Sequence, residues 1–137
     1  CQEKVRYIMD TFYGNKPDAL SGNDDCGQMS AWYIFNTMGF YPTAPSSNVY
    51  NLGSPGLAAV DMKMSNGKHL RMTTGNWSAR NVFVKEVYLN GKKYDKSYIT
   101  YNDIKDGADL HFVMSSRPNY KRGVAERAVP PSVSEKR

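Results

Sequence analysis

Apolar residues near the start of the chain recur at the spacing of an α-helix in two segments. Residues 2–13 carry them at positions i, i+3, i+4 and i+7, as Val5, Ile8, Met9 and Phe12. This spacing predicts an amphipathic helix that ends at the breakers of residues 14–18. A second segment, about residues 26–38, is apolar on almost every side at its centre. It predicts a helix that is buried on several faces, with Trp32 and Tyr33 in the core.

The residues that follow have a different pattern, in which short apolar runs alternate with Gly, Pro and Asn-Gly turns. These runs predict six strands, at residues 48–52, 57–64, 69–74, 82–89, 98–101 and 109–114. Asn66-Gly67 and Asn90-Gly91 have the composition of tight hairpin turns. Short strands joined in this way predict an antiparallel sheet that is part of a β-sandwich.

The predicted elements divide the 137 residues into three parts and indicate an α+β fold class. Residues 1–44 hold the two helices, and residues 45–119 form an antiparallel β region. Residues 120–137 are charged, contain Pro130-Pro131 and lack periodicity, so they are predicted to be a disordered basic tail. The first predicted helix begins almost at Cys1 without a preceding signal-peptide pattern. We therefore expect the chain to be a piece of a longer protein.

Charge and cysteine content argue against several classes of function. Residues 117–137 contain six basic and two acidic residues, so four of the five net positive charges lie there. The other residues are nearly neutral and show no basic stripe with interleaved aromatics, so no nucleic-acid partner is expected. No apolar run is long enough to span a membrane. Cys1 and Cys26 can pair or remain free, and the spacing of His and Cys does not fit a zinc site.

The strongest chemical signal is the segment Gly22-Asn23-Asp24-Asp25-Cys26-Gly27-Gln28. Two adjacent carboxylates lie in a glycine-flanked turn that leads into the second predicted helix. A rigid element that presents an acid at its start can hold a general base in a hydrolase. The structural alternative is that Asp25 caps the helix, with Gln28 three residues later as in a capping box. The two roles partly conflict, because a carboxylate that accepts a helix N–H is a weaker base.

An ordered series of motifs resembles glycoside hydrolase family 92, the calcium-dependent exo-acting α-mannosidases. The series consists of residues 21–33, then Met38-Gly39-Phe40-Tyr41-Pro42, and then residues 50–55. Three later pieces also resemble the family: Asn66-Gly67-Lys68, Leu89-Asn90-Gly91 and Arg117-Pro118-Asn119. The resemblance covers about residues 2–119, and the ordered combination is far more specific than any one piece.

The resemblance implies a fold in which an N-terminal β-sandwich is followed by an (α/α)6 barrel and by C-terminal strands. This chain resembles the last helices of that barrel, followed by antiparallel strands of a sandwich. Family members invert the anomeric centre. Inversion requires an acid and a base roughly 6.5–9.5 Å apart, with water between the base and the sugar. The resemblance places the acid, a Glu, outside this chain.

The resemblance also implies roles for individual residues. It assigns the general base to Asp25 and leaves Asp24 as a second catalytic candidate, which could assist the base, bind sugar or structure the loop. Asn23, where some family members have an acid, and Gln28 are candidates for contact with the substrate. Calcium is the implied cofactor, and oxygen ligands are expected for it, although no ligand is assigned to a residue.

The implied function is hydrolysis of terminal mannose, expected to be α-1,2-linked, from glycans by the full-length protein. Its implied partners are a mannose-containing glycan and the remainder of the enzyme chain, and its implied location is the periplasm, the cell surface or the medium. The isolated chain is expected to be inactive, since it lacks the acid. Two alternatives remain: a non-catalytic carbohydrate-binding or structural β-sandwich module, suggested by the predicted strands, and a glycoside phosphorylase with a similar barrel.

Overall fold

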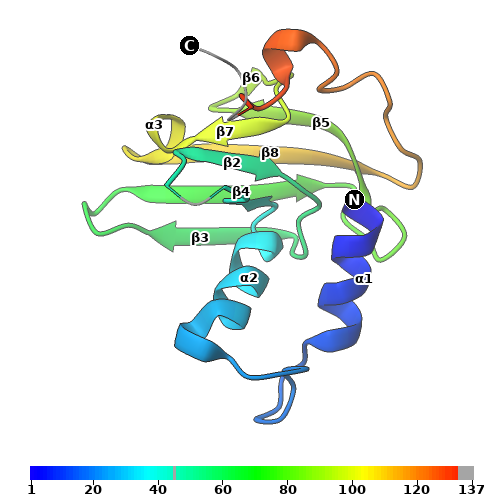
Figure 1. Cartoon of the computed structure of the whole chain (residues 1–137). Helices are drawn as coiled ribbons and strands as arrows, with labels where there is room; N and C mark the ends of the chain where they lie inside the picture. Colours follow the sequence, from blue (N-terminus) through cyan, green and yellow to red (C-terminus); the bar gives the residue numbers. More distant parts are fainter. Residues whose placement is uncertain (45, 133–137) are drawn as a thin grey trace.

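A computed structural model of the chain describes residues 1–44 and 46–132. Two helices, α1 (Gln2–Phe12) and α2 (Gln28–Thr37), stand side by side below a layered β-structure. They are joined at their far ends by residues 13–27 (Figure 1). Both predicted helices are therefore present, and the predicted acidic turn lies in the connection between them.

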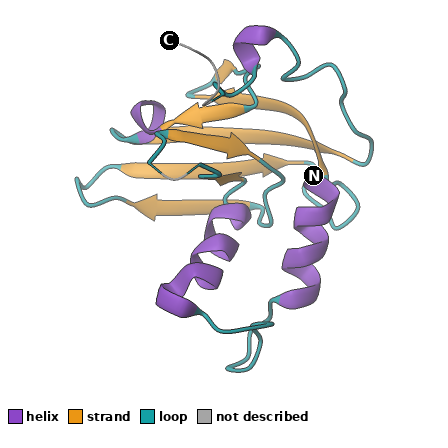
Figure 2. Ribbon diagram, viewed as in Figure 1, coloured by secondary structure: helices purple, strands orange, loops and turns teal. Residues whose placement is uncertain are grey.

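The strands form two sheets, both visible in Figure 2. The three-stranded sheet is antiparallel and has the order β1-β2-β7, with β1 at Phe40–Tyr41, β2 at Val49–Leu52 and β7 at Tyr98–Thr100. The five-stranded sheet has the order β3-β4-β8-β5-β6. Its strands are Ala59–Lys63 (β3), His69–Gly75 (β4), Phe83–Leu89 (β5), Lys92–Lys93 (β6) and Ala108–Ser115 (β8). All six predicted strands are present, whereas the two-residue strands β1 and β6 were not predicted.

Buried apolar side chains of both sheets meet in one core. Phe40 of β1 and Ile99 of β7 belong to the same buried cluster as Met72 of β4 and Phe112 of β8. Gly39 directly precedes β1 with φ 84°, and a Cβ atom on it would lie 2.9 Å from Cζ of Phe112. Glycine therefore lets the end of α2 turn into β1 in close contact with the five-stranded sheet. This arrangement confirms the predicted α+β class.

One pair of strands departs from the predicted antiparallel arrangement. β4 and β8 are parallel neighbours, with Leu70 opposite Ala108 and Gly75 opposite Val113. Between them the chain forms the β5–β6 hairpin, joins the other sheet as β7 and returns through the short helix α3 (Tyr101–Ile104). This path lets β8 enter between β4 and β5. The prediction of an entirely antiparallel region is therefore wrong for this pair, although the two Asn-Gly hairpins are confirmed.

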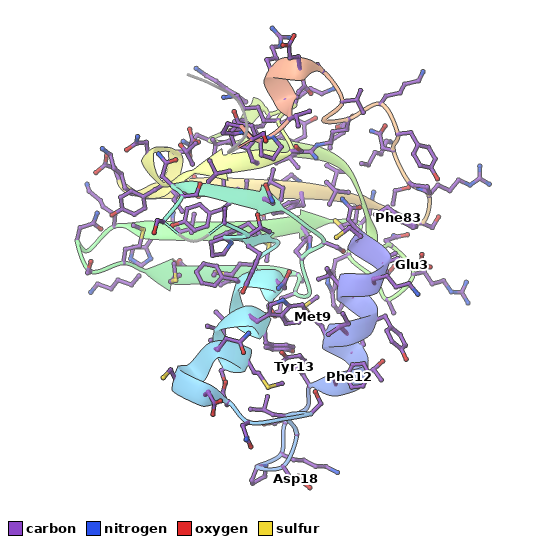
Figure 3. The ribbon with its side chains drawn as sticks, in the orientation of Figure 1. Glu3, Met9, Phe12, Tyr13, Asp18 and Phe83 are labelled. Carbon is purple, nitrogen blue, oxygen red and sulfur yellow. The ribbon has the colours of Figure 1, made fainter. Side chains whose placement is uncertain are left out.

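The buried face of α1 is rotated away from its predicted apolar stripe. Arg6 and Met9 are buried, whereas Phe12 is exposed. The guanidinium of Arg6 donates a 2.5 Å hydrogen bond to the backbone carbonyl of Pro55, which gives this buried cation a partner. Figure 3 shows Met9 pointing toward α2 and Phe12 pointing away from it.

α2 is less enclosed within the described residues than its sequence predicts. Phe35 packs against the core, with its ring centroid 5.8 Å from that of Phe40. By contrast, Tyr33 and Ile34 are 38% and 56% exposed. One side of this apolar helix therefore covers the sheets, while another side faces solvent.

The segment predicted to be a disordered tail is partly ordered. Residues 120–132 are described, and they contain the short 3-10 helix η2 (Glu126–Ala128). The backbone carbonyl of Ala128 accepts hydrogen bonds from the backbone N–H and the hydroxyl of Ser97, both at 2.8 Å. The guanidinium of Arg122 donates to the backbone carbonyl of Lys96 at 2.6 Å. The prediction missed these contacts because they depend on a distant segment. Residues 133–137 lie outside the described residues.

Candidate active site

The carboxylate of Asp24 closes the turn that precedes α2. Its Oδ1 atom accepts the backbone N–H groups of Met29 at 2.8 Å and of Ser30 at 3.0 Å. Its Oδ2 atom accepts the hydroxyl of Ser30 at 2.5 Å. These bonds satisfy N–H groups in the first turn of the helix, which have no partner within the helix itself. The hydrogen bonds, that of the Ser30 hydroxyl above all, lower the pKa of Asp24, so this carboxylate is ionised at neutral pH.

Asp25 does not cap the helix as predicted. Gly27 is the N-cap residue of α2 and has no side chain to cap with. Between Asp24 and α2 the chain makes the 3-10 turn η1 (Asp25–Gly27), in which Cys26 and Gly27 have left-handed φ values of 54° and 74°. The helix therefore starts at Gln28, later than predicted, and the capping role belongs to Asp24.

The carboxylate of Asp25 is exposed at this turn. It has no hydrogen bond and no ion pair with any residue of the described ranges. The other two predicted site residues are also exposed. Asn23 lies in the same turn, and Gln28 is the first residue of α2. The structure therefore brings the four predicted residues together on one short segment. It gives Asp24 a set of helix contacts and leaves Asp25 open to solvent.

Tyr13 belongs to this region, although its sequence position alone did not single it out. It follows directly after α1, and Figure 3 shows its side chain between the two helices. Its ring stacks on Trp32 with a centroid distance of 5.5 Å, and on Tyr33 with a distance of 4.9 Å. Burial raises the pKa of the Tyr13 phenol, and the negative charge of Asp24 raises it further. The available signal was an aromatic residue placed just before a polar loop and an aromatic-rich helix.

A hollow of about 500 Å³ opens beside this aromatic cluster. Its lining residues come from the end of α1, the connecting loop and α2: Tyr13, Gly14, Asn15, Leu20, Ser30, Tyr33 and Ile34. Aromatic faces combined with a few polar groups are typical of sites for small molecules. Ser30 links this hollow to the carboxylate of Asp24, to which its hydroxyl donates.

The described residues hold no ready-made metal centre. Within residues 1–44 and 46–132, no three His, Cys, Asp or Glu side chains gather in a group that could hold an ion. Cys1 and Cys26 are both exposed free thiols, so the disulfide that the sequence allowed is not formed. None of the helices that the structure describes has the length and apolar character needed to cross a bilayer.

The Glycosyl hydrolase family 92 catalytic domain matches residues 1–116. The chain belongs to glycosyl hydrolase family 92. The match extends from α1 through the acidic turn to the end of β8. It confirms the resemblance carried by the motif series.

Solved structures of family 92 members share the fold of this chain. The GH92 α-mannosidase BT3965 from Bacteroides thetaiotaomicron, solved alone and in complex with mannoimidazole, is 67% identical, with a TM-score of 0.94 over 98% of this chain. The GH92 inverting mannosidase BT2199 from Bacteroides thetaiotaomicron VPI-5482 is 34% identical, with a TM-score of 0.88 over 98% of this chain. An uncharacterized secreted glycosidase from Arthroderma benhamiae is 29% identical over 124 residues, or 88% of this chain.

The chain spans a minor share of these family 92 relatives. It covers 18% of the length of BT3965 and of BT2199, and 16% of the length of the Arthroderma benhamiae glycosidase. This chain, with its acidic turn, therefore corresponds to one part of those much longer proteins.

Proposed function

We propose that this chain is the C-terminal portion of an inverting exo-α-mannosidase that removes terminal mannose from glycans. The observation that carries the proposal is the 67% identity with the α-mannosidase BT3965 over 98% of the chain. The similarity to the inverting mannosidase BT2199 supports the stereochemical outcome. An exposed carboxylate next to a rigid helix supplies a group suited to hydrolysis.

Asp25 is the proposed general base. The absence of partners for its carboxylate among the described residues supports this role, because its oxygen atoms stay available to accept a proton from water. In an inverting reaction this water attacks the anomeric carbon while an acid protonates the leaving oxygen from the opposite side. Asp24 is adjacent in sequence and ionised, so a Glu elsewhere in the full-length protein is the proposed acid. Asn23 and Gln28 are proposed to contact sugar hydroxyls, since both are exposed on the same segment.

α1 and α2 are proposed to be the last helices of an (α/α)6 barrel. An apolar groove of about 380 Å³ lies between α2 and the sheets and is lined by residues that include Ile34, Phe35, Met62 and Tyr101. Exposed apolar surface of this kind is typical of faces that other protein covers. The missing acid and the open surface both lead us to expect that the isolated chain has no hydrolase activity.

Calcium is the proposed cofactor of the full-length enzyme, on the basis of the family. Calcium takes six to eight oxygen ligands in proteins. The described residues alone do not fit such a site, because they contain no group of three candidate ligands and the carboxylate of Asp24 already accepts three hydrogen bonds. The remainder of the enzyme would therefore have to supply most of the ligands.

The proposed substrate is α-1,2-linked mannose at the end of a glycan, and the proposed location of the full-length enzyme is the periplasm, the cell surface or the medium. The location is supported by the secreted character of the Arthroderma benhamiae glycosidase. The proposed partners are the glycan and the remainder of the enzyme chain.

The stereochemistry of the first product tests this function. The full-length protein is mixed with α-1,2-mannobiose, and the anomeric protons are followed by NMR before mutarotation. We expect β-mannose to appear first, with slower turnover of α-1,3- and α-1,6-mannobiose. Initial release of α-mannose would contradict inversion, and failure to hydrolyse any of the three would contradict the function. The isolated 137-residue chain serves as the comparison and is expected to release no mannose.

The alternatives have less support. A non-catalytic β-sandwich module does not account for a match to a catalytic domain that includes both helices and the acidic turn. A phosphorylase would require inorganic phosphate and release mannose 1-phosphate. The NMR experiment distinguishes it, since turnover is expected to proceed at full rate without phosphate.

A further inference from the structure

We propose that Asp24 is a positioning residue. Its carboxylate ties the turn of residues 24–27 to the first turn of α2 and so fixes the placement of Asp25. This inference rests on the proposed function, in which Asp25 is the general base. It adds a division of roles between two adjacent carboxylates: one binds the protein and the other is left free to act on water.

The hydrogen bonds of Asp24 close a loop of the chain that contains Asp25. They run from the Asp24 carboxylate to Met29 and Ser30, so the chain from residue 24 to residue 30 forms a closed loop. A further bond, at 2.9 Å, joins the Gly27 N–H to the backbone carbonyl of Asp24. Asp25 lies inside this loop, where its backbone carbonyl accepts the N–H of Gln28. Its side chain makes no bond with the described residues, so the placement of its carboxylate depends on the loop that the bonds of Asp24 close.

The backbone of the enclosed segment needs such support. Cys26 has φ 54° and Gly27 has φ 74°, so two successive residues are left-handed. A non-glycine residue in this region is strained and persists where surrounding contacts determine it. A Cβ atom on Gly27 would meet no atom within 4 Å, so the conformation itself, not crowding, favours glycine there. Without the bonds of Asp24, we expect this segment to relax to other conformations and to move Asp25 with it.

The helix to which Asp24 is fastened is itself held in place. Phe35 of α2 packs into the core, and Trp32 stacks on Tyr13 at the end of α1. The core thus holds α2, α2 holds the carboxylate of Asp24, and the bonds of Asp24 hold the turn that contains Asp25. A misplacement of about 1 Å at a reacting group can cost about 100-fold in rate, so this support matters to a general base.

The chemistry of Asp24 fits a positioning role better than proton transfer. Both of its oxygen atoms accept hydrogen bonds, and those bonds favour the charged form over the protonated form. Its lowered pKa agrees with this geometry. Taking up a proton would weaken all three bonds and release the turn during the reaction.

Kinetics of the full-length enzyme test the proposal with Asp24→Ala, Asp24→Asn and Ser30→Ala. Asparagine keeps a carbonyl oxygen that can accept the two backbone N–H groups, whereas alanine keeps none. We expect Asp24→Ala to lower kcat by about 100-fold, with little change in KM. We expect Asp24→Asn and Ser30→Ala to lower kcat by about 10-fold or less. All three variants should retain a fall in kcat on the acid side, and Asp18→Asn, in the exposed connecting loop, is the control.

Hydrogen exchange of peptides that cover residues 22–30 gives a second reading that is independent of turnover. In Asp24→Ala we expect the amides of Met29 and Ser30 to exchange about 10-fold faster or more, because their acceptor is gone. Equal exchange in wild type and Asp24→Ala would overturn the proposal, as would an unchanged kcat. If Asp24→Asn were as inactive as Asp24→Ala and lost the acid-side fall in kcat, Asp24 would exchange the proton itself. If the wild type hydrolysed no mannoside, the proposed function would fail, while the exchange experiment would still decide whether Asp24 holds the turn.

Discussion

The ring of Tyr13 lies nearly parallel to that of Trp32, with 5.5 Å between their centroids and 15° between their planes. The contact joins the end of α1 to α2 on the side far from the sheets. Nearer the sheets, the Sδ atom of Met9 lies 4.0 Å from the hydroxyl of Thr37. Contacts thus join the two helices near both of their ends. This pair of helices is the frame from which the acidic turn extends.

This frame predicts that Tyr13→Ala destabilises the chain. Tyr13 stacks on two aromatic rings, and each such pair contributes roughly 0.5–1.5 kcal/mol beyond the area that it buries. We expect the free energy of unfolding to fall by about 2 kcal/mol, measured by urea unfolding with tryptophan fluorescence. Tyr120, which is 83% exposed, provides the control. Tyr120→Ala should change stability by less than about 0.5 kcal/mol, and equal effects of the two substitutions would contradict this account of the frame.

Gly39 is predicted to be intolerant of even a methyl group. Its φ is 84°, and an added Cβ would lie 2.9 Å from the Phe112 ring and 3.2 Å from Pro55. Gly39→Ala should therefore cost roughly 2–4 kcal/mol in the free energy of unfolding, by backbone strain and overpacking together. A Cβ on Gly53 would meet nothing within 4 Å, so Gly53→Ala should be close to neutral. A similar urea midpoint for both variants would show that this close approach is not needed.

Much of this fold could be predicted from local patterns, because alternation and turn chemistry act over a few residues. The strand predicted at 69–74 is found at His69–Gly75, and the Asn90-Gly91 turn has the two left-handed residues that its composition predicts. The strands β1 and β6 were missed because a two-residue strand leaves no periodic pattern. The parallel pairing of β4 and β8 was missed because it depends on the path of the intervening chain.

The candidate site was predicted in its residue types but not in its contacts. Two adjacent carboxylates before an apolar helix can be recognised from a few neighbouring residues, and in the structure both precede α2. Which of them caps the helix depends on the left-handed residues Cys26 and Gly27, which delay the start of α2. That delay moves the capping role from Asp25 to Asp24. The burial of Arg6 is likewise unpredictable from α1 alone, since its partner, Pro55, is distant in sequence.

An acid-sensitive contribution to stability is predicted on the five-stranded sheet. Asp61 of β3 contacts His69 at 2.5 Å and Arg71 at 3.1 Å on β4. The hydrogen bond with His69, and then that with Arg71, lowers the pKa of Asp61 from its ordinary value of 3.8. Because the folded-state pKa is the lower one, the stabilisation is present above about pH 4 and is lost as the pH falls through the folded-state value.

The test of this contribution is urea unfolding of wild type and Asp61→Asn between pH 7 and pH 2. The stability difference between them should be present at about pH 5 and should shrink below pH 4. Asp18→Asn, in the exposed connecting loop, should show no such change. A difference that stays constant down to pH 2 would refute the role of the ionised carboxylate.

The apolar groove beside α2 predicts the behaviour of the isolated chain. Ile34 is 56% exposed at this groove, so the chain should bind an environment-sensitive apolar dye. Ile34→Lys should reduce the dye fluorescence at least about twofold, because it places a charge among apolar side chains. Val124→Lys changes an exposed residue of the ordered C-terminal segment and should leave the fluorescence unchanged. Equal reductions by both variants would mean that the dye does not report on this groove.

Whether Asp25 removes a proton from the attacking water is decided by the kcat of full-length Asp25→Ala on α-1,2-mannobiose. A general base contributes roughly 10²–10⁴-fold to the rate. We predict that kcat falls by a factor in this range while the melting temperature stays close to that of wild type. Turnover equal to that of wild type would contradict the account.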